Sequence, residues 1–273
     1  MTQNPTLTRR PISQTAKVLS LTPRGKNLYQ LTLKLATLGP FADPGLFARL
    51  RSWGPAPAAY PLLDRPFSIH RYRPNQGELD FLIRPVGLGT NLLTQCRLGD
   101  PIQLLGPLGQ GLGNLIPDYK NRPFYLVAGG VGLAPMANLI DQSKGPNHLF
   151  YGEREGQSLI DKAYLTSFAP NFTAVSEDGL GYGEKGLVTQ SLKAALERER
   201  RTIFACGPQG LLAALAPLAR SYGVNCYVAA EAYMACGLGV CLSCGHYLVD
   251  GSRIRLCQDG PVVDGLLMDW EKS

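Results

Sequence analysis

The sequence predicts a β plus α/β fold: an N-terminal antiparallel β-barrel, a central doubly wound parallel sheet and a C-terminal metal-binding segment. Three observations predict it. Short strand patterns separated by Pro, Gly and Asn run through residues 14–110, strands alternate with helical patterns over 122–225, and cysteine and glycine concentrate in 226–273. A chain of 273 residues is long enough for two modest domains, each with its own core.

Composition and charge exclude several classes of protein. With 45% hydrophobic residues the chain is not disordered, and no apolar run approaches the roughly 18–20 residues of a membrane span. The net charge of +6 comes from scattered residues, which argues against nucleic-acid binding. Residues 1–13 match no pattern and contain no apolar signal sequence, which predicts a flexible tail on a cytoplasmic protein.

Alternation of apolar and polar residues predicts the strands of the first domain. Leu31, Leu33 and Leu35 alternate with polar residues, which is the period-2 pattern of a strand with one buried face. Further strands are predicted at 47–51, 67–70, 79–84 and 102–105. Short strands separated by turn residues at this spacing favour a small antiparallel barrel.

The second domain is predicted where the pattern changes from successive strands to strands that alternate with helices. Strands are predicted at 124–128, 148–151, 173–176 and 203–205, and helices at 134–142, 188–198 and 211–220. Strand alternating with helix is typical of a doubly wound sheet, which binds its ligand at the carboxyl ends of the strands. Pro217 is expected to kink or shorten the last of these helices.

Glycine-marked strand ends in the second domain indicate a dinucleotide site. Gly129, Gly130 and Gly132 lie between a predicted strand and a predicted helix, where glycines let the backbone approach a pyrophosphate. The run is not a G-x-G-x-x-G fingerprint, so a purely structural turn is the alternative. Two further strand ends of this kind favour the nucleotide site. One is Cys206-Gly207-Pro208, and the other is Tyr151-Gly152-Glu153-Arg154.

An acidic residue at another strand end bears on the choice of dinucleotide. Glu177 follows the strand 173–176, and a carboxylate at this point can accept hydrogen bonds from the hydroxyls of an adenosine ribose. It would also repel a 2′-phosphate, which favours NAD over NADP. The alternative is a solvated acid in the turn Glu177-Asp178-Gly179.

Four cysteines of the C-terminal segment have the spacing of a metal site. Cys236, Cys241, Cys244 and Cys257 form C-x4-C-x2-C followed by a distant cysteine, which matches the plant-type [2Fe–2S] pattern. Two glycines between the first two cysteines let the loop wrap round a cluster and leave its N–H groups free to bond sulfur. A four-cysteine zinc site is the alternative, although such sites usually contain two C-x2-C pairs and only one occurs here.

The barrel domain contains a run suited to a flavin. In residues 65–68, Arg-Pro-Phe-Ser, the arginine suits bidentate phosphate binding, and an aromatic residue beside a small hydroxyl can flank an isoalloxazine ring. Further along, Gly89 and Thr90 predict a helix start that can take a phosphate oxygen. The order of these runs along the chain makes the case for a flavin site.

Taken together, these runs resemble the ferredoxin–NAD(P) reductase-like flavoprotein family, whose members join an FAD-binding barrel to an NAD-binding α/β domain. The family motif Arg-x-Tyr/Phe-Ser assigns Arg65 to the FAD pyrophosphate, Phe67 to the isoalloxazine face and Ser68 to the flavin edge. Phenylalanine in place of tyrosine keeps the stacking but loses a hydroxyl. The resemblance implies the FAD-binding residues Arg65, Pro66, Phe67, Ser68, Leu82, Ile83, Arg84, Gly89 and Thr90.

The C-terminal pattern narrows this resemblance. The run from Glu231 to Pro261 is similar to that of the electron transfer subunits of type B dihydroorotate dehydrogenases. This similarity implies that the four cysteines bind the cluster and that the turn at 206–208 faces the nicotinamide. The predicted domains are then an FAD-binding barrel (14–110), an NAD-binding α/β domain (122–225) and a [2Fe–2S] cluster-binding segment (226–273).

The resemblance implies a redox function in which cofactors do the chemistry. Electrons would pass from the FMN of a catalytic dihydroorotate dehydrogenase subunit through the cluster and FAD to NAD⁺ in pyrimidine synthesis, and the two subunits would form a heterotetramer. The sequence contains no Ser/His/Asp triad or paired-carboxylate site, and His70, His148 and His246 are scattered, so each is interpreted as a surface or packing residue. Small FAD/[2Fe–2S] subunits of bifurcating transhydrogenases and sulfhydrogenases are alternatives. A zinc-stapled nucleotide-binding regulatory module is an alternative of another class.

Overall fold

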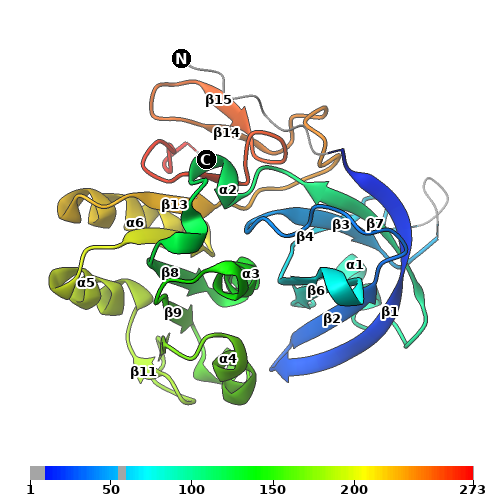
Figure 1. Cartoon of the computed structure of the whole chain (residues 1–273), viewed down its shortest axis with the longest axis horizontal. Coiled ribbons are helices and arrows are strands. Elements are labelled where there is room, and N and C mark those ends of the chain that lie inside the picture. Colours follow the sequence, from blue (N-terminus) through cyan, green and yellow to red (C-terminus); the bar gives the residue numbers. More distant parts are fainter. Residues whose placement is uncertain (1–9, 55–59, 273) are drawn as a thin grey trace.

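A computed structural model describes residues 10–54 and 60–272 and divides the chain between two seven-stranded sheets and a two-stranded hairpin (Figure 1). Most of the predicted tail, residues 1–9, lies outside the described residues. The first strand already begins at Ile12 and pairs with Gly106, so the sheet takes in two residues of the segment predicted as tail.

The first sheet is antiparallel, in the order β4-β3-β7-β1-β2-β6-β5. Its strands are β1 (Ile12–Gly25), β2 (Leu28–Lys34), β3 (Phe47–Arg51), β4 (Arg65–Ser68), β5 (Arg71–Arg73), β6 (Glu78–Ile83) and β7 (Pro101–Leu108). Leu31, Leu33 and Leu35 are buried as the alternation predicts, but Thr32 between them is buried as well, so β2 does not have the single buried face that was predicted. The alternation is clear in β1, where Gln14, Ala16 and Val18 are buried. The inward-facing side chains of all these strands form one core.

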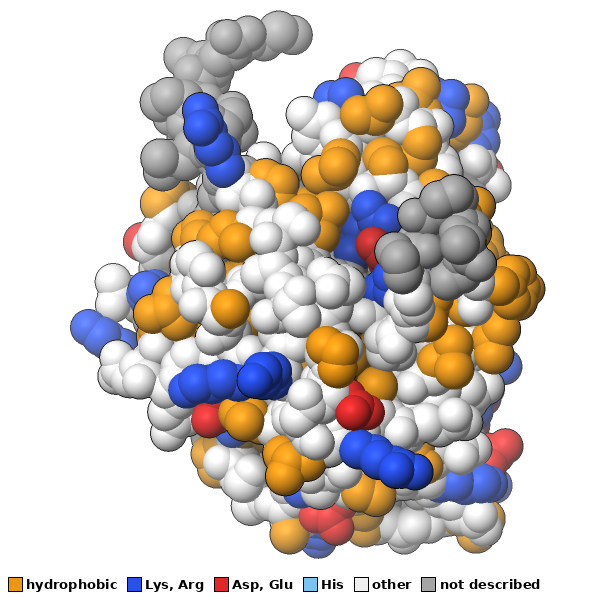
Figure 2. Space-filling model, turned by 90° about the vertical axis from the view of Figure 1, so that its right-hand side faces the viewer, with side chains coloured by type: hydrophobic (Ala, Val, Ile, Leu, Met, Phe, Trp, Pro, Cys, Tyr) orange, Lys and Arg blue, Asp and Glu red, His pale blue; other side chains and the backbone are white. Residues whose placement is uncertain are grey.

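Two backbone hydrogen bonds close the first sheet into a barrel. The Ile69 N–H donates to Leu46 O at 2.9 Å and the His70 N–H donates to Asp80 O at 2.9 Å, so the chain crosses here from one edge of the sheet to the other. This crossing explains why the strand predicted at 67–70 ends at Ser68. Figure 2 views the barrel side of the molecule, where charged side chains of both signs are scattered among apolar ones.

The second sheet has the order β11-β10-β9-β8-β12-β13-β16 and is parallel except for its last strand. Its strands are β8 (Phe124–Gly129), β9 (His148–Glu153), β10 (Phe172–Ser176), β11 (Glu184–Lys185), β12 (Thr202–Cys206), β13 (Cys226–Ala229) and β16 (Val262–Asp264). The chain proceeds outward from β8 to β11 and then returns to the other side of β8. The strand order therefore reverses between β8 and β12, which confirms the doubly wound fold and marks a ligand-binding crevice.

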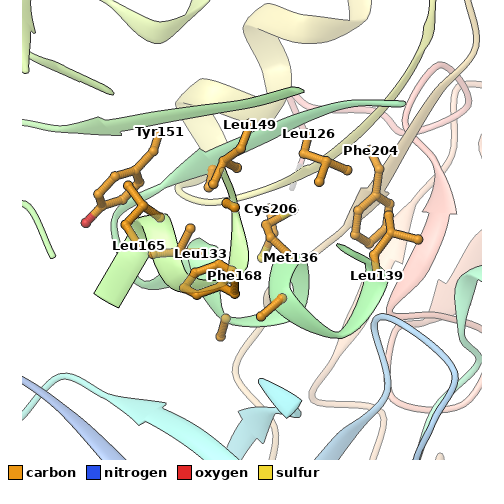
Figure 3. Packing of buried hydrophobic residues seen from close by; sticks show 14 of the residues in the cluster. Leu126, Leu133, Met136, Leu139, Leu149, Tyr151, Leu165, Phe168, Phe204 and Cys206 are labelled. Carbon is orange, nitrogen blue, oxygen red and sulfur yellow. The ribbon is translucent and has the colours of Figure 1, made fainter. Parts of the chain in front are cut away.

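Helices cover both faces of the second sheet (Figure 1). Leu126 packs into one core with α3 (Ala134–Gln142) and α4 (Lys162–Phe168), whereas its neighbour Val127 packs into the other with α5 (Val188–Arg198) and α6 (Gln209–Tyr222). Figure 3 shows the first of these cores, with strand side chains such as Leu149 and Phe204 directed at the helices. The shorter helices are α1 (Leu88–Leu93), α2 (Leu112–Leu115), η1 (Pro74–Gln76), η2 (Tyr119–Asn121), η3 (Gly130–Leu133) and η4 (Gly156–Ser158).

Helix α6 continues through Pro217 to Tyr222, so the prediction that this proline shortens it is wrong. Pro217 lies on the exposed side of α6, where water can bond the Ala213 carbonyl that loses its N–H donor. The buried side, which includes Leu212, Leu215 and Ala219, packs on the sheet and keeps the helix in place.

The C-terminal segment lies against both domains (Figure 1). Two of its strands, β13 and β16, complete the second sheet, so the boundary predicted at 226 passes through that sheet. The remaining strands, β14 (Gly245–Tyr247) and β15 (Arg253–Arg255), form a hairpin. The Gln110 N–H, just after β7, donates to Gly260 O, which fixes the segment to the barrel.

The three histidines pack against aromatic rings, as the sequence predicts. His70 lies between the two domains, where it donates from Nδ1 to Ala134 O (2.8 Å) and accepts at Nε2 from the Tyr164 hydroxyl (2.8 Å). Burial lowers the pKa of His70 to about 4, so it is neutral at pH 7. None of the helices in the described part of the chain has both the length and the apolar character that a bilayer span requires.

Candidate functional site

Two clefts open where the barrel meets the second sheet. The barrel cleft, of about 280 Å³, lies between β4, β6 and the segment that follows β13. The sheet cleft, of about 640 Å³, lies over the carboxyl ends of the parallel strands, at the crevice that the strand order predicts. Arg84 lines both clefts, so they are neighbours.

The barrel cleft brings together most of the residues predicted to bind FAD. Its lining includes Pro66, Phe67, Ser68, Leu82, Arg84 and Thr90. The Phe67 ring packs edge-on against Phe81, with centroids 6.4 Å apart, which fixes its orientation. The structure does not bring the side chain of Ile83 to the cleft, because successive strand residues face opposite sides and Ile83 is fully buried in the barrel core.

Arg65 lies beside the start of α1 rather than in the lining of the barrel cleft. A Cβ at Gly89 would stand 2.8 Å from Arg65 Nε, so the absence of a side chain lets the guanidinium approach the helix. The Thr90 hydroxyl accepts hydrogen bonds from Val86 N (2.9 Å) and Gly87 N (3.1 Å) and so holds the turn before α1. It therefore shapes the turn that the sequence predicts to contact phosphate.

A partly buried ion pair separates the two clefts, since the Arg84 side chain is half-buried and that of Glu153 is buried. Arg84 donates to Glu153 at 2.6 Å, and Glu153 also accepts from the Tyr151 hydroxyl at 2.8 Å. Burial raises the pKa of Tyr151 well above its ordinary value, so this hydroxyl remains a donor. The sequence predicts the strand end that contains Glu153 as part of the nucleotide site, but it gives the Glu153 side chain no role of its own. Gly152, Glu153 and Arg154 all line the sheet cleft.

The sheet cleft holds four of the predicted NAD-binding residues in its lining: Gly129, Gly130, Glu177 and Pro208. The other two glycines allow close packing beneath it. A Cβ at Gly132 would overlap the carbonyl oxygen of Cys206, and a Cβ at Gly207 would stand 3.0 Å from Gly129 N. These glycines thus let the turns after β8 and β12 approach each other.

Cys206 is buried at the end of β12 and does not line either cleft. Its Sγ lies 3.9 Å from a carboxylate oxygen of Glu231, which does line the barrel cleft. Burial raises the pKa of the Cys206 thiol well above its ordinary value and also raises the pKa of Glu231. Cys206 is therefore a neutral thiol behind the cleft at pH 7.

Three of the four cysteines of the C-terminal motif lie in residues 236–244, here called the cysteine loop, and Cys257 lies in the turn after β15 and packs against this loop. The cysteines form two pairs: the Cys241 N–H donates to Cys236 Sγ at 3.4 Å, and the Sγ atoms of Cys244 and Cys257 are 3.1 Å apart. A hydrogen bond with the Ser243 hydroxyl, 3.2 Å away, lowers the pKa of the Cys241 thiol to about 6. Within the part of the chain that the structure describes, no three His, Cys, Asp or Glu side chains converge closely enough to hold one metal ion.

The loop fits a two-iron cluster better than a single ion. Paired cysteines suit two irons with two thiolates each, whereas one zinc ion needs four ligands around one point. The loop N–H groups already donate to sulfur: Leu238 to Cys236 (3.3 Å) and Gly239 to Cys257 (3.1 Å). Gly239 has a φ of +77°, a conformation that favours glycine. Such N–H donors stabilise negative charge on thiolate sulfur.

Comparison with protein families finds matches over both the sheet and the cysteine loop. The family described as the iron–sulfur cluster binding domain of dihydroorotate dehydrogenase B matches residues 231–268, and the family described as the oxidoreductase NAD-binding domain matches residues 126–216. The first match contradicts the zinc alternative. It covers the four cysteines and also Glu231, which lines the barrel cleft.

Whole-chain comparisons agree with these matches. The electron transfer subunit of dihydroorotate dehydrogenase B (NAD(+)) from Desulforamulus reducens is 30% identical over 94% of this chain and 98% of its own length. That of Geobacillus thermodenitrificans is 34% identical over 86% and 90%. A solved NADH-dependent reduced ferredoxin-NADP oxidoreductase, studied for flavin-based electron bifurcation, is 24% identical with a TM-score of 0.79 over 94% of this chain and 90% of that chain, and so shares its fold.

The fold, the two clefts and the cysteine loop define a flavin- and iron–sulfur-dependent NAD oxidoreductase subunit. Subunits of this class serve several different enzymes, and sequence identity of 30–34% over most of the length of curated relatives shows which enzyme family this chain matches. The chain belongs to the family of electron transfer subunits of dihydroorotate dehydrogenase B.

Proposed function

We propose that this chain carries electrons from the FMN of a catalytic dihydroorotate dehydrogenase subunit, by way of a [2Fe–2S] cluster and FAD, to NAD⁺. The observation that carries the proposal is the order of the three sites. Met234 lines the barrel cleft two residues before Cys236, and Arg84, which lines the same cleft, also lines the sheet cleft. The cysteine loop, the barrel cleft and the sheet cleft therefore follow one another in space.

Each site is assigned its own group of residues. In the barrel cleft, Phe67 and Ser68 would contact the flavin ring, and Arg65 would bind the FAD pyrophosphate beside α1. When bound, FAD would accept electrons one at a time and pass them on in pairs as a hydride. The protein contributes binding and orientation. The four cysteines would hold the cluster. In the sheet cleft the backbone of Gly129 and Gly130 would face the NAD pyrophosphate.

Glu177 supports NAD as the dinucleotide. Its side chain is exposed at the sheet cleft, and its own N–H donates to Glu153 O at 3.2 Å, which fixes its backbone at the end of β10. From this place a carboxylate would accept ribose hydroxyls and repel a 2′-phosphate. We place the protein in the cytoplasm, because a reducing compartment keeps the cluster thiols from forming disulfides.

The partner would dock on the cysteine loop. Cys241 is exposed there among apolar side chains that are themselves exposed, namely Leu238 (44%), Val240 (79%) and Leu242 (57%). Apolar side chains on a loop that must exchange electrons with another subunit indicate an interface. The partner is a catalytic subunit containing FMN, and the assembly is a heterotetramer.

Co-purification with an FMN-containing dihydroorotate dehydrogenase tests the whole proposal. The complex is expected to contain FMN, FAD, iron and sulfide, and to reduce NAD⁺ when supplied with dihydroorotate. Protein purified anaerobically with iron and sulfide but without FAD would contradict the proposal, because nothing would then convert single electrons into a hydride.

Val240→Asp is expected to weaken docking. A charge placed in the centre of an apolar interface must be desolvated, so the dissociation constant of the complex should rise about tenfold or more. Leu98→Asp is the matched control, since Leu98 is equally exposed (78%) on a loop of the barrel. Isothermal titration of both variants with the catalytic subunit measures the difference. Equal affinities for the two variants would contradict the docking surface.

Arg65→Ala is expected to lower FAD occupancy. The change removes a charge-assisted contact to phosphate, which contributes about 1.5–3 kcal/mol. The flavin content after dialysis, read from the visible spectrum, measures the loss. Arg97→Ala, on the exposed loop before β7, should leave the flavin content unchanged. Wild-type flavin content in the Arg65 variant would contradict the assignment of Arg65.

A further inference from the structure

Arg49 joins the barrel to the cysteine loop. Its side chain leaves β3 and is only 14% exposed. Its Nη1 donates to the carbonyl oxygen of Cys236 at 2.6 Å, and its Nη2 lies 2.9 Å from Asp64 Oδ2. Arg49 is thus a barrel residue that binds the backbone of a predicted cluster ligand directly.

The cysteine loop is shaped to accept this arginine. Gly237, next to Cys236, has a φ of +66°, and a Cβ at this position would stand 2.8 Å from Arg49 Cδ. A side chain at 237 would therefore displace the arginine or the loop. Arg49 Nε is buried and has no hydrogen-bond partner among the described residues. The guanidinium is therefore held through its two terminal nitrogens, by the carbonyl oxygen of Cys236 and by Asp64.

The local charge around Arg49 is positive. Asp64 is shared between two arginines, since Arg51 Nε also contacts it at 2.6 Å. Among the described residues, this one carboxylate faces the two guanidinium groups, so one positive charge next to the loop has no ion-pair partner there. Arg49 is the member of this trio that reaches Cys236.

We propose that Arg49 is a positioning residue for the iron–sulfur cluster, which fixes the loop 236–239 on the barrel and favours the reduced cluster through its positive charge. The inference rests on the proposed function, since it needs the four cysteines to hold a cluster. Reduction adds one electron and therefore one negative charge to the cluster, with no bond made or broken. A fixed cation beside the loop stabilises that added charge and raises the reduction potential.

The test compares Arg49→Gln with Arg255→Gln in the reconstituted full-length protein. Arg255 is a matched control, because its Nη1 also donates to a carbonyl of the loop, Gly239 O (3.4 Å), but it is 39% exposed and its charge is compensated by Asp259. An anaerobic redox titration followed by electron paramagnetic resonance measures the potential. Arg49→Gln should shift the reduction equilibrium about threefold to tenfold toward the oxidised cluster. The control should shift it by much less. Equal shifts in the two variants overturn the proposal.

Two further variants keep the proposal testable if Arg49→Gln folds poorly. Arg49→Lys retains the charge and should keep a potential near that of the wild type. Asp64→Asn removes the compensating carboxylate and should shift the equilibrium in the opposite direction, toward the reduced cluster. A wild-type potential in Asp64→Asn, or a loss in Arg49→Lys as large as in Arg49→Gln, overturns the role of charge.

Hydrogen exchange of the cluster-free protein tests the positioning role without the cofactor. Arg49→Gln should speed exchange of the Leu238 and Gly239 amides, whereas Arg255→Gln should change it less. Unchanged exchange in Arg49→Gln overturns the positioning role. A wild-type protein that never takes up iron and sulfide would instead contradict the proposed function, so the two failures are distinguishable.

Discussion

Cys241→Ser is expected to abolish cluster binding and partner-driven NAD⁺ reduction while FAD remains bound. Cys241 is the most exposed of the four predicted ligands, and the Ser243 hydroxyl favours its thiolate by lowering its pKa. A serine hydroxyl is a far weaker ligand for iron, because it stays protonated at pH 7. Iron and sulfide content, together with NADH formation from dihydroorotate in the assembled complex, measure the two losses.

FAD should survive this change because the barrel cleft is built mainly by other elements. Pro66 and Ser68 belong to β4 and Leu82 to β6. The segment after β13 that also lines the cleft is held independently, since the Ala230 N–H donates to Pro261 O at 2.9 Å. Loss of the cluster should therefore leave the flavin absorption intact.

Cys96→Ser is the control for Cys241→Ser. Cys96 lies outside the cysteine motif, and its Sγ donates to Leu92 O at 3.5 Å, a bond that a serine hydroxyl can replace. This variant should keep its iron and its NAD⁺ reduction. If Cys241→Ser still couples dihydroorotate oxidation to NADH formation, electrons do not travel by way of the cysteine loop.

The sequence alone was sufficient to predict features whose residues lie close together in the chain. The C-x4-C-x2-C spacing predicts the loop that holds Cys236 and Cys241, and the glycine turn predicts the approach of β8 to the start of α3. The strand end at Gly207-Pro208 indicated a crevice, and Pro208 lines the sheet cleft as expected. Each of these features depends on neighbours within a few residues, which is what a single sequence displays.

Features that depend on distant partners could not be read in this way. β16 is three residues long and joins the second sheet only by pairing with β13, more than thirty residues earlier. Arg49 occurs in an ordinary strand pattern, and its role depends on a loop some 187 residues away. Likewise, the partner of Arg84 is Glu153, on the other domain. Strand pairing and ion pairs of this kind are set by tertiary packing.

Gly132→Ala is expected to destabilise the protein and weaken NAD binding together. A Cβ at this position would overlap the carbonyl oxygen of Cys206 and lie 2.6 Å from Gly207 N. Both are backbone atoms, so no side-chain rotation relieves the clash, and the turns after β8 and β12 must move apart. We expect a loss of about 3 kcal/mol, the upper part of the usual range for overpacking. Thermal unfolding and NAD⁺ titration measure the two effects.

Gly210→Ala is the control for the stability effect of Gly132→Ala, because a Cβ at Gly210 meets no protein atom within 4 Å. Gly210 lines the sheet cleft, so this variant is not a control for NAD binding. Gly210 lies in the first turn of α6, where alanine is favoured over glycine by about 0.5–1 kcal/mol. The control should therefore unfold at the wild-type temperature or slightly above it. If both variants are equally stable, the two strand ends are not packed as the structure has them. If Gly132→Ala loses stability but binds NAD⁺ normally, the turn supports the sheet alone and the dinucleotide lies elsewhere.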